Sequence, residues 1–400
     1  MSARVFFYVQ HLLGIGHLRR AATLARALAA GGFDVLVVSG GAPTPLDLGQ
    51  ARFHQLPPVR ARDEGLRELV RLDGTPLDEA FRLARTNQLV ELLRAEAPNI
   101  LVTEQFPFGR TQLRFELLPL IEAARALRPR PLIVSSIRDV LRRSVSAERV
   151  AETIETFAAF DLVLIHGDPR LVGLDRSFAG WEHIKSRAVY TGYVSDADFA
   201  AASSSAAGKG EVIVSVGGGA VGLPLLEAAI AARPSSALAD RPWRLLVGAN
   251  APAGVLGAAS LDAGKGFIVE PARPDFTTLL RNAALSISQA GYNTVIETLC
   301  CADRAVLVPF GTERETEQSD RAQLLTERGM VASVAADALS PASLAAAVGR
   351  ALAGPSIRSF PPCDVRGAPR TVEVLKASLI RSDRGPPGPL MSGAGAPRSE

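Results

Sequence analysis

The sequence contains little cysteine and little lysine. Its three cysteines, Cys300, Cys301 and Cys363, form no C-x-x-C pair, and no histidine lies close to them in the chain. Adjacent cysteines rarely bond to each other, so we expect neither a zinc site nor a disulfide framework. Only four of the 44 basic residues are lysines, and the net charge is +3. This even balance gives no indication of nucleic-acid binding.

Long apolar runs are also missing. The chain has no stretch of 18 apolar residues, and it begins almost directly on a strand pattern, Val5–Val9, without a charged leader or a cleavage site. We therefore expect a cytoplasmic protein, and peripheral contact with the inner face of the plasma membrane stays open. The chain is 47% hydrophobic, which is enough to bury the cores of about two to three domains.

Apolar runs of strand length alternate with helical patterns throughout. The predicted strands lie near Val5–Val9, Phe33–Val38, Ile100–Thr103, Leu132–Ser135 and Leu162–Ile165, and then near Val212–Val216, Arg244–Val247, Phe267–Val269, Leu285–Ser288 and Ala305–Val308. This alternation is typical of parallel sheets built from βαβ units. We therefore predict an α/β protein with two doubly wound, Rossmann-like domains that face each other across a cleft.

The domain boundaries follow from composition. Residues 1–194 form the first predicted domain and residues 211–380 the second. Residues 195–210 are the predicted linker, because the stretch Ala201–Gly208 is small, polar and unpatterned. Residues 381–400 are rich in proline and glycine, and we expect them to form a disordered tail.

Charged and polar residues follow several strands of the first half. Ligands of open parallel sheets bind beyond the carboxyl ends of the strands. The candidates at these positions are Gln10, His11, Glu104, Arg138, Asp139, His166 and Asp168. Arg110 belongs to the aromatic segment Phe106–Arg110, which could form an acceptor wall or a membrane-facing patch, or simply pack beneath a loop.

A short glycine-containing loop, Gly14–His17, joins the first strand to the first long helix. Its backbone N–H groups at the helix start could hold a phosphate or a developing oxyanion. Arg19 stands where a dinucleotide fingerprint has its third glycine, which argues against NAD or FAD. His17 could act as a general base or donate a hydrogen bond to a diphosphate, and the plain alternative is a histidine that only caps the helix.

A second glycine-rich loop opens the other domain. Gly217, Gly218 and Gly219 follow a predicted strand and precede a helix, which suits phosphate binding, and Ser215 could add a hydroxyl. The loop lacks the G-K-[ST] of a P-loop, so we do not expect ATP hydrolysis. The alternative is an ordinary strand-to-helix turn.

The most informative stretch runs from Leu285 to Glu297. It has the pattern of a strand, a tight turn and the first turns of a helix. The Glu297 carboxylate could accept both hydroxyls of a ribose, and the adjacent helix N-terminus favours anions. The alternative is a surface glutamate beside an ordinary turn. The D-x-D sequence Asp196-Ala197-Asp198 lies in the predicted linker, so we expect it to be solvated and predict no obligatory metal.

These motifs together resemble the GT-B glycosyltransferases, and more closely the MurG-like (peptidoglycan N-acetylglucosaminyltransferase) superfamily of bacterial cell-envelope enzymes. The features that carry the resemblance are Gly16-His17, Thr191–Val194, Gly217–Gly219, Ser288–Glu297, and Pro309-Phe310 followed by Glu317-Gln318. Three departures are Ile15 where the family has glycine, Glu317 where it has glutamine, and Arg321 where it has asparagine.

The resemblance implies roles for individual residues. Glu297 would bind the donor ribose, and Gly291, Asn293 and Thr294 would lie beside the diphosphate. Gln318 and Glu317 would meet hydroxyls of the donor sugar, and the backbone at Ile268 would recognise uracil. His17, with Gly16 before it, would lie near the reaction centre. From their places after the strands and in the aromatic segment, we also expect Glu104, Arg110, Arg138 and His166 to hold the acceptor in the first domain.

The predicted activity is a metal-independent, inverting transfer of a hexose or N-acetylhexosamine. The donor is a nucleotide-diphosphate sugar, with UDP favoured, and the acceptor hydroxyl belongs to a glycan, a lipid or a small molecule. The base is His17, or a carboxylate such as Asp139 or Asp168. A nucleotide-sugar hydrolase, a 2-epimerase and a non-catalytic nucleotide-sugar sensor stay open as alternatives.

Overall fold

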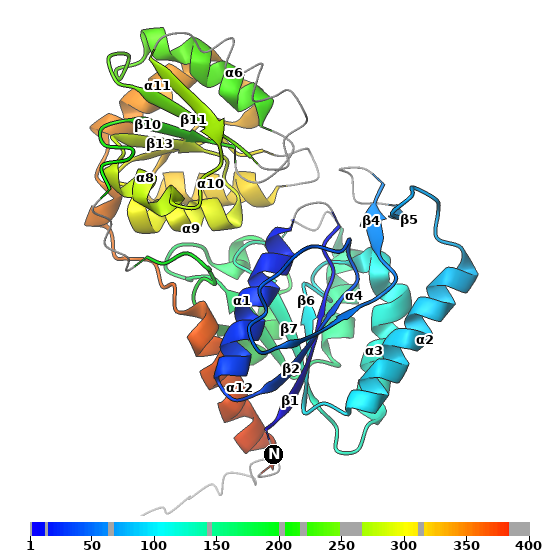
Figure 1. Ribbon diagram of the computed structural model, residues 1–400. Coiled ribbons are helices and arrows are strands. Elements are labelled where there is room, and N and C mark those ends of the chain that lie inside the picture. The colour runs from blue at the N-terminus through cyan, green and yellow to red at the C-terminus, as the bar shows by residue number, and fades with distance from the viewer. Residues whose placement is uncertain are drawn as a thin grey trace, which may run out of the picture.

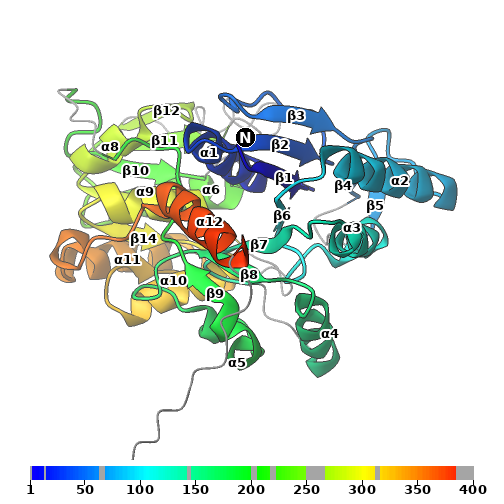
Figure 2. The same ribbon diagram turned by 90° about the horizontal axis from the view of Figure 1, so that it is seen from below.

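Two parallel sheets, each flanked by helices, lie side by side (Figures 1 and 2). The computed structural model describes residues 2–12, 15–62, 68–141, 146–199, 205–216, 222–248, 266–310 and 316–383. The prediction of two doubly wound α/β domains is confirmed.

The first domain contains a seven-stranded, wholly parallel sheet in the order β3-β2-β1-β6-β7-β8-β9. Its strands are β1 (Arg4–Val9), β2 (Asp34–Ser39), β3 (Arg52–Gln55), β6 (Ile100–Glu104), β7 (Leu132–Arg138), β8 (Leu162–His166) and β9 (Ala188–Tyr190). Its helices are α1 (Gly16–Ala30), α2 (Glu79–Glu96), α3 (Arg114–Ala126), α4 (Ala147–Phe157) and α5 (Trp181–Ile184). A small antiparallel pair is formed by β4 (Val59–Ala61) and β5 (Leu69–Arg71).

The second domain contains a six-stranded parallel sheet in the order β12-β11-β10-β13-β14-β15. Its strands are β10 (Val212–Ser215), β11 (Trp243–Val247), β12 (Phe267–Pro271), β13 (Leu285–Ser288), β14 (Ala305–Leu307) and β15 (Ala332–Ser333). Its helices are α6 (Leu223–Ala232), α8 (Phe276–Asn282), α9 (Tyr292–Cys301), α10 (Glu317–Glu327) and α11 (Pro341–Ala353).

The central strands carry continuous apolar runs because helices cover both faces of each sheet. Every residue of β1 from Val5 to Val9 is buried, and so is the whole of β11, including Trp243. In each sheet the strand order reverses beside a central strand, between β1 and β6 in the first and between β10 and β13 in the second. Such a switch point opens a crevice at the carboxyl ends of the strands, where ligands bind.

The last helix, α12 (Gly367–Asp383), corrects the predicted domain boundary, which assigned residues 211–380 to the second domain. The helix packs on α1 of the first domain (Figures 1 and 2). Leu375 is buried there, and Val372 and Leu379 pack beside it. The chain therefore crosses between the domains twice, and the second crossing is the segment Pro361–Arg366. The helix also extends into the predicted tail, and residues 384–400 lie outside the described part of the chain.

Some elements were not predicted because their sequences carry no clear apolar period. Helix α2 buries Arg85 and Thr86 alongside Leu89 and Leu93, so its inward face is half polar. The Arg85 guanidinium pairs with Glu116 of α3 (Nε–Oε2 2.5 Å), and both side chains are fully buried. Strands β3, β9 and β15 are short or exposed, which leaves little pattern to recognise.

Candidate active site at the domain junction

The carboxyl ends of the first sheet meet the N-termini of α9 and α10 from the second domain. Tyr292, the first residue of α9, joins the two domains through its phenol group. The phenol donates to the backbone oxygen of His166 (2.9 Å) and accepts a hydrogen bond from the backbone N–H of Val194 (3.1 Å). The phenol is therefore held through both its hydrogen and its oxygen. Candidate site residues from the two halves of the sequence come together at this junction.

His17 and Glu104 form a pair at this junction. His17 lies in the first turn of α1, and its Nδ1 is 2.9 Å from Oε1 of Glu104, the last residue of β6. A carboxylate accepts a hydrogen bond, so the proton is assigned to Nδ1 and the lone pair to Nε2. Burial, together with the nearby guanidiniums of Arg138, Arg110 and Arg20, holds the pKa of His17 well below 6.5. The imidazole is therefore neutral near pH 7 and can accept a proton.

Glu104 is also the centre of a buried polar network. It accepts hydrogen bonds from the Arg20 guanidinium and from Ser136 Oγ (3.0 Å). Ser136 Oγ lies 3.0 Å from Nε2 of His166, whose Nδ1 lies 2.8 Å from Thr191 Oγ1. Both ring nitrogens of His166 are thus engaged, and burial lowers its pKa well below 6.5. This network fixes the orientation of the Glu104 carboxylate and, through it, of the His17 ring.

Arginines from both domains surround the Tyr292 ring. The guanidinium carbons of Arg20, Arg138 and Arg321 lie 5.4, 5.5 and 5.8 Å from the ring centroid. Arg138 also contacts Glu317 of α10 across the junction (Nη1–Oε1 3.0 Å), and Arg321 contacts the same carboxylate (2.9 Å). Burial alone would raise the pKa of Glu317, but these two guanidiniums lower it to about 2.

Arg20, Arg110 and Arg138, which we call the arginine cluster, have hydrogen-bond donors that are not used. Within the described ranges, the buried nitrogens without a hydrogen-bond partner include Nε and Nη1 of Arg20, Nε of Arg110 and Nε of Arg138. Burial lowers the pKa of Arg110 to about 10, although nearby Glu104 opposes this effect. A buried cation without a full set of partners is costly, so this cluster favours the approach of an anion.

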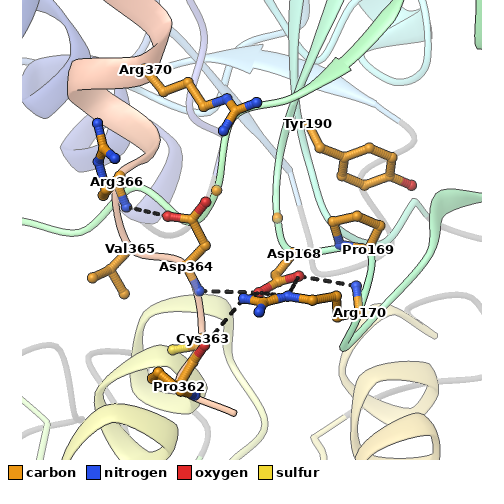
Figure 3. Close-up of a pocket in the computed structure, with 12 residues that line it drawn as sticks. Asp168, Pro169, Arg170, Tyr190, Pro362, Cys363, Asp364, Val365, Arg366 and Arg370 are labelled. Atoms are coloured by element: carbon orange, nitrogen blue, oxygen red, sulfur yellow. Dashed lines mark hydrogen bonds and ion pairs between the residues drawn. The ribbon is translucent and has the colours of Figure 1, made fainter.

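Asp139 and Asp168, the carboxylates predicted as alternative bases, are both held by arginines. Asp139 is fully buried and takes two hydrogen bonds from Arg321 of the second domain (2.7 and 3.0 Å). Asp168 is held by Arg170 (2.6 Å) and by the backbone N–H of Asp364 (3.1 Å). The Asp168 carboxylate borders a cavity of about 570 Å³ beside the second crossing (Figure 3). Among the described residues, neither carboxylate makes a hydrogen bond or ion pair with His17.

The N-terminus of α9 has the form that the sequence predicted. Gly291 is the N-cap, and a Cβ there would meet no atom of the described residues within 4 Å. Asn293 and Thr294 are half-buried in the first turn. Glu297 follows one turn later, and within the described part of the chain no hydrogen bond engages its carboxylate. Burial and the charge of Asp196 raise its pKa to about 7, and Arg19 opposes this.

The remaining predicted residues lie in several places. Gln318 uses its Oε1 to accept the backbone N–H of Phe310 (3.0 Å), and Ser215 ends β10 opposite Ser288 of β13. Ile268 is half-buried in the edge strand β12. A Cβ at Gly16 would come within 3.1 Å of Arg138 Nη2, so a side chain at this position would crowd the arginine. The loop Gly217–Gly219 lies outside the described residues.

The rings of the aromatic segment pack in the core of the first domain. Phe106 is buried in the core of the first domain, and the Phe108 ring lies 5.4 Å from Phe157 and 5.3 Å from Phe178. The described ranges contain no group of three or more His, Cys, Asp or Glu side chains placed to hold a metal ion. Nor do they include a helix long and apolar enough to cross a membrane.

Arg20, Ser136 and Thr191 belong to the site but were not predicted as site residues. Arg20 lies three residues after His17 on α1, a spacing that places both on one helix face, and this signal could have identified it. Ser136 and Thr191 are of residue types too common near strand ends to be selected by position alone.

Two facing Rossmann-like domains with a site between them define the GT-B fold, and solved structures of that fold match the chain over nearly its full length. MurG of Acinetobacter baumannii matches with a TM-score of 0.61 at 16% identity, covering 94% of this chain and 99% of MurG. A UDP-glucosyltransferase of Polygonum tinctorium matches with a TM-score of 0.60 at 13% identity, covering 96% and 98%. The spinosyn rhamnosyltransferase SpnG, solved with thymidine diphosphate, matches with a TM-score of 0.55 at 16% identity, covering 96% and 100%.

In sequence, residues 260–357 match the glycosyltransferase family 28 C-terminal domain. This segment includes α9 and α10, whose residues Tyr292 and Glu317 contact the first domain. No curated protein matches the sequence. The family match and the fold together support a glycosyltransferase that is similar to MurG.

Proposed function

We propose that the protein is an inverting, metal-independent glycosyltransferase that moves a hexose or N-acetylhexosamine from a nucleotide-diphosphate sugar, with UDP as the favoured nucleotide. The observation that carries this proposal is His17, which Glu104 holds in place on α1, the helix whose Arg20 lies against the Tyr292 ring at the start of α9. The first domain thus offers a base for an acceptor hydroxyl. The second domain offers the N-terminus of α9 and the Glu297 carboxylate, which are the features expected of a donor site.

On the donor side, the Glu297 carboxylate would accept hydrogen bonds from the ribose hydroxyls. The first turn of α9, at Gly291, Asn293 and Thr294, would face the diphosphate with its backbone N–H groups and positive helix end. The arginine cluster of Arg20, Arg110 and Arg138 would add positive potential beside the leaving diphosphate, where negative charge develops.

On the acceptor side, Nε2 of His17 would take the proton of the attacking hydroxyl. The oxygen of that hydroxyl would form a bond to the anomeric carbon while the bond from that carbon to the diphosphate oxygen breaks, which inverts the configuration. Glu104 would hold the His17 ring and stabilise the imidazolium that forms, because its carboxylate is already hydrogen-bonded to Nδ1. His17 is favoured over Asp139 and Asp168 because arginines already hold both of those carboxylates.

The proposal is tested by following the products from UDP-glucose and UDP-N-acetylglucosamine, with and without a cell extract as a source of acceptors. Transfer predicts UDP release that depends on the extract and that continues in the presence of EDTA. Rapid release of free sugar without extract would identify a hydrolase, an isomerised donor would identify an epimerase, and binding without turnover would identify a sensor.

The matched variants are His17→Ala and His183→Ala. His183 is exposed in α5, so its removal should leave turnover unchanged. Full turnover in His17→Ala would remove this histidine from the mechanism. Loss of turnover on adding EDTA would overturn metal independence while leaving the transferase assignment in place.

A further inference from the structure

Two cysteines that are far apart in the sequence meet at the second crossing between the domains. Cys300 lies near the end of α9, Cys363 lies in the segment Pro361–Arg366, and their sulfur atoms are 3.0 Å apart. This distance is only about 1 Å longer than a disulfide bond of about 2.05 Å. The adjacent Cys301 is buried in the core between the domains and makes no sulfur contact with either within the described structure.

The Cys363 thiol is the reactive member of the pair. Cys363 borders the cavity of about 570 Å³ that it shares with Asp168, Arg170, Tyr190 and Arg370, so a small reagent can reach it (Figure 3). The two thiols share a hydrogen bond, which lowers the pKa of Cys363 and raises the pKa of Cys300. The thiolate is the nucleophilic form of cysteine, so Cys363 reacts first and Cys300 retains its proton.

The geometry points to a reversible modification site in which a hydroperoxide oxidises Cys363 and Cys300 completes a disulfide. The Cys363 thiolate attacks one peroxide oxygen, the O–O bond breaks, and a sulfenic acid forms, while the departing oxygen takes a proton from solvent and leaves as water or alcohol. The Cys300 sulfur then attacks the sulfenic sulfur, the S–O bond breaks, and the departing hydroxide takes the Cys300 proton as water. Two thiols lose two electrons to the peroxide, and an external dithiol reverses the reaction.

The bond would connect α9 to the crossing segment, which is hydrogen-bonded to the first domain. Residue Asp364, next to Cys363, accepts the backbone N–H of Tyr193 (2.7 Å) and donates its own N–H to Asp168 (3.1 Å). Cys300 lies three residues after Glu297 on the same helix. Oxidation therefore fixes the crossing segment to the helix of the proposed donor site. We call this cross-link the clamp. If the proposed function holds, the clamp should slow turnover, because it restrains the motion of one domain relative to the other.

The test treats the full-length protein with hydrogen peroxide and follows thiols, mass and turnover. Oxidation should reduce the titratable thiols from three to one per chain. Peptide mapping should find Cys300 joined to Cys363, and dithiothreitol should restore all of the thiols. Cys301→Ser should still form the link and Cys363→Ser should not, whereas Cys300→Ser should hold a sulfenic acid at Cys363 that dimedone traps.

An unchanged thiol count, a link that uses Cys301, or a disulfide between two chains would overturn the proposal. Turnover of a UDP-sugar should fall on oxidation and recover with dithiothreitol in the wild type, and should not respond in Cys300→Ser. Equal turnover by the oxidised and reduced forms would refute the clamp. If the reduced protein turns over no donor at all, the proposed function fails, and thiol titration still decides the disulfide.

Discussion

Replacement of Glu297 by alanine should weaken the binding of UDP far more than it affects folding. The Glu297 carboxylate is half-buried on α9 and has no hydrogen-bond partner within the described residues, so its oxygens are available to a ligand. Burial and the charge of Asp196 raise its pKa to about 7, against the opposing charge of Arg19. A side chain held in this condition has little structural value, and its removal should leave the unfolding midpoint of the unliganded protein nearly unchanged.

The size of the effect follows from the number of ribose hydroxyls. Each hydrogen bond to a charged acceptor contributes about 1.5–3 kcal/mol, so two such bonds contribute about 3–6 kcal/mol. At about 1.4 kcal/mol for each tenfold change, the Kd for UDP should rise by roughly 10²- to 10⁴-fold. A nucleotide without the 2′-hydroxyl can form only one of the bonds, so 2′-deoxy-UDP should bind the wild type roughly 10- to 100-fold more weakly than UDP does.

Isothermal titration calorimetry with UDP and 2′-deoxy-UDP on the wild type and Glu297→Ala completes a double-mutant cycle. The variant should bind both nucleotides weakly and should no longer distinguish them, because the carboxylate that reads the 2′-hydroxyl is gone. Equal UDP affinity in the wild type and the variant would refute the ribose assignment. So would a preference for UDP over 2′-deoxy-UDP that survives in the variant.

Three further predictions concern the base, the junction and pH. His17→Ala should reduce kcat while leaving the Kd for UDP unchanged, which steady-state kinetics and calorimetry would show; a matching loss of UDP affinity would contradict the role as base. Arg321→Ala should lower the free energy of unfolding by about 3–5 kcal/mol, because it leaves the buried Asp139 carboxylate without the guanidinium that balances its charge. Urea denaturation measures this, with the exposed Arg94→Ala as a control near zero. UDP affinity should increase as pH rises through about 7, since ribose hydroxyls bind the ionised Glu297. If Glu297→Gln shows the same pH dependence of binding, that dependence comes from titration of the nucleotide and not of Glu297.

The fold was predictable because its signals are local. Parallel strands buried on both faces appear as apolar runs, and each predicted strand overlaps an observed one, from β1 to β14. The turn before α9 was predictable for the same reason, since strand, Gly291 cap and helix are adjacent in sequence. Helix α2 was missed because its buried positions include Arg85, which pairs with Glu116 on another helix.

The parts that sequence could not supply are long-range pairs. Arg321 was noted only as a departure from a family pattern, yet its guanidinium joins Asp139 of the other domain across 182 positions of sequence. Cys300 and Cys363 likewise meet only because the chain returns to the first domain before α12. Such contacts depend on how the two domains pack, and no periodicity within either domain encodes them. The Gly217–Gly219 loop and the assigned roles of the individual donor residues stay predictions.

The most direct test of the account is the thermal unfolding midpoint of the purified protein against UDP-, dTDP- and GDP-sugars. A ligand that binds only the folded state raises this midpoint. The account predicts a clear rise with one nucleotide family, UDP being favoured, and loss of that rise in Glu297→Ala. No rise with any of these nucleotide sugars would contradict the donor site, and with it the proposed glycosyl transfer.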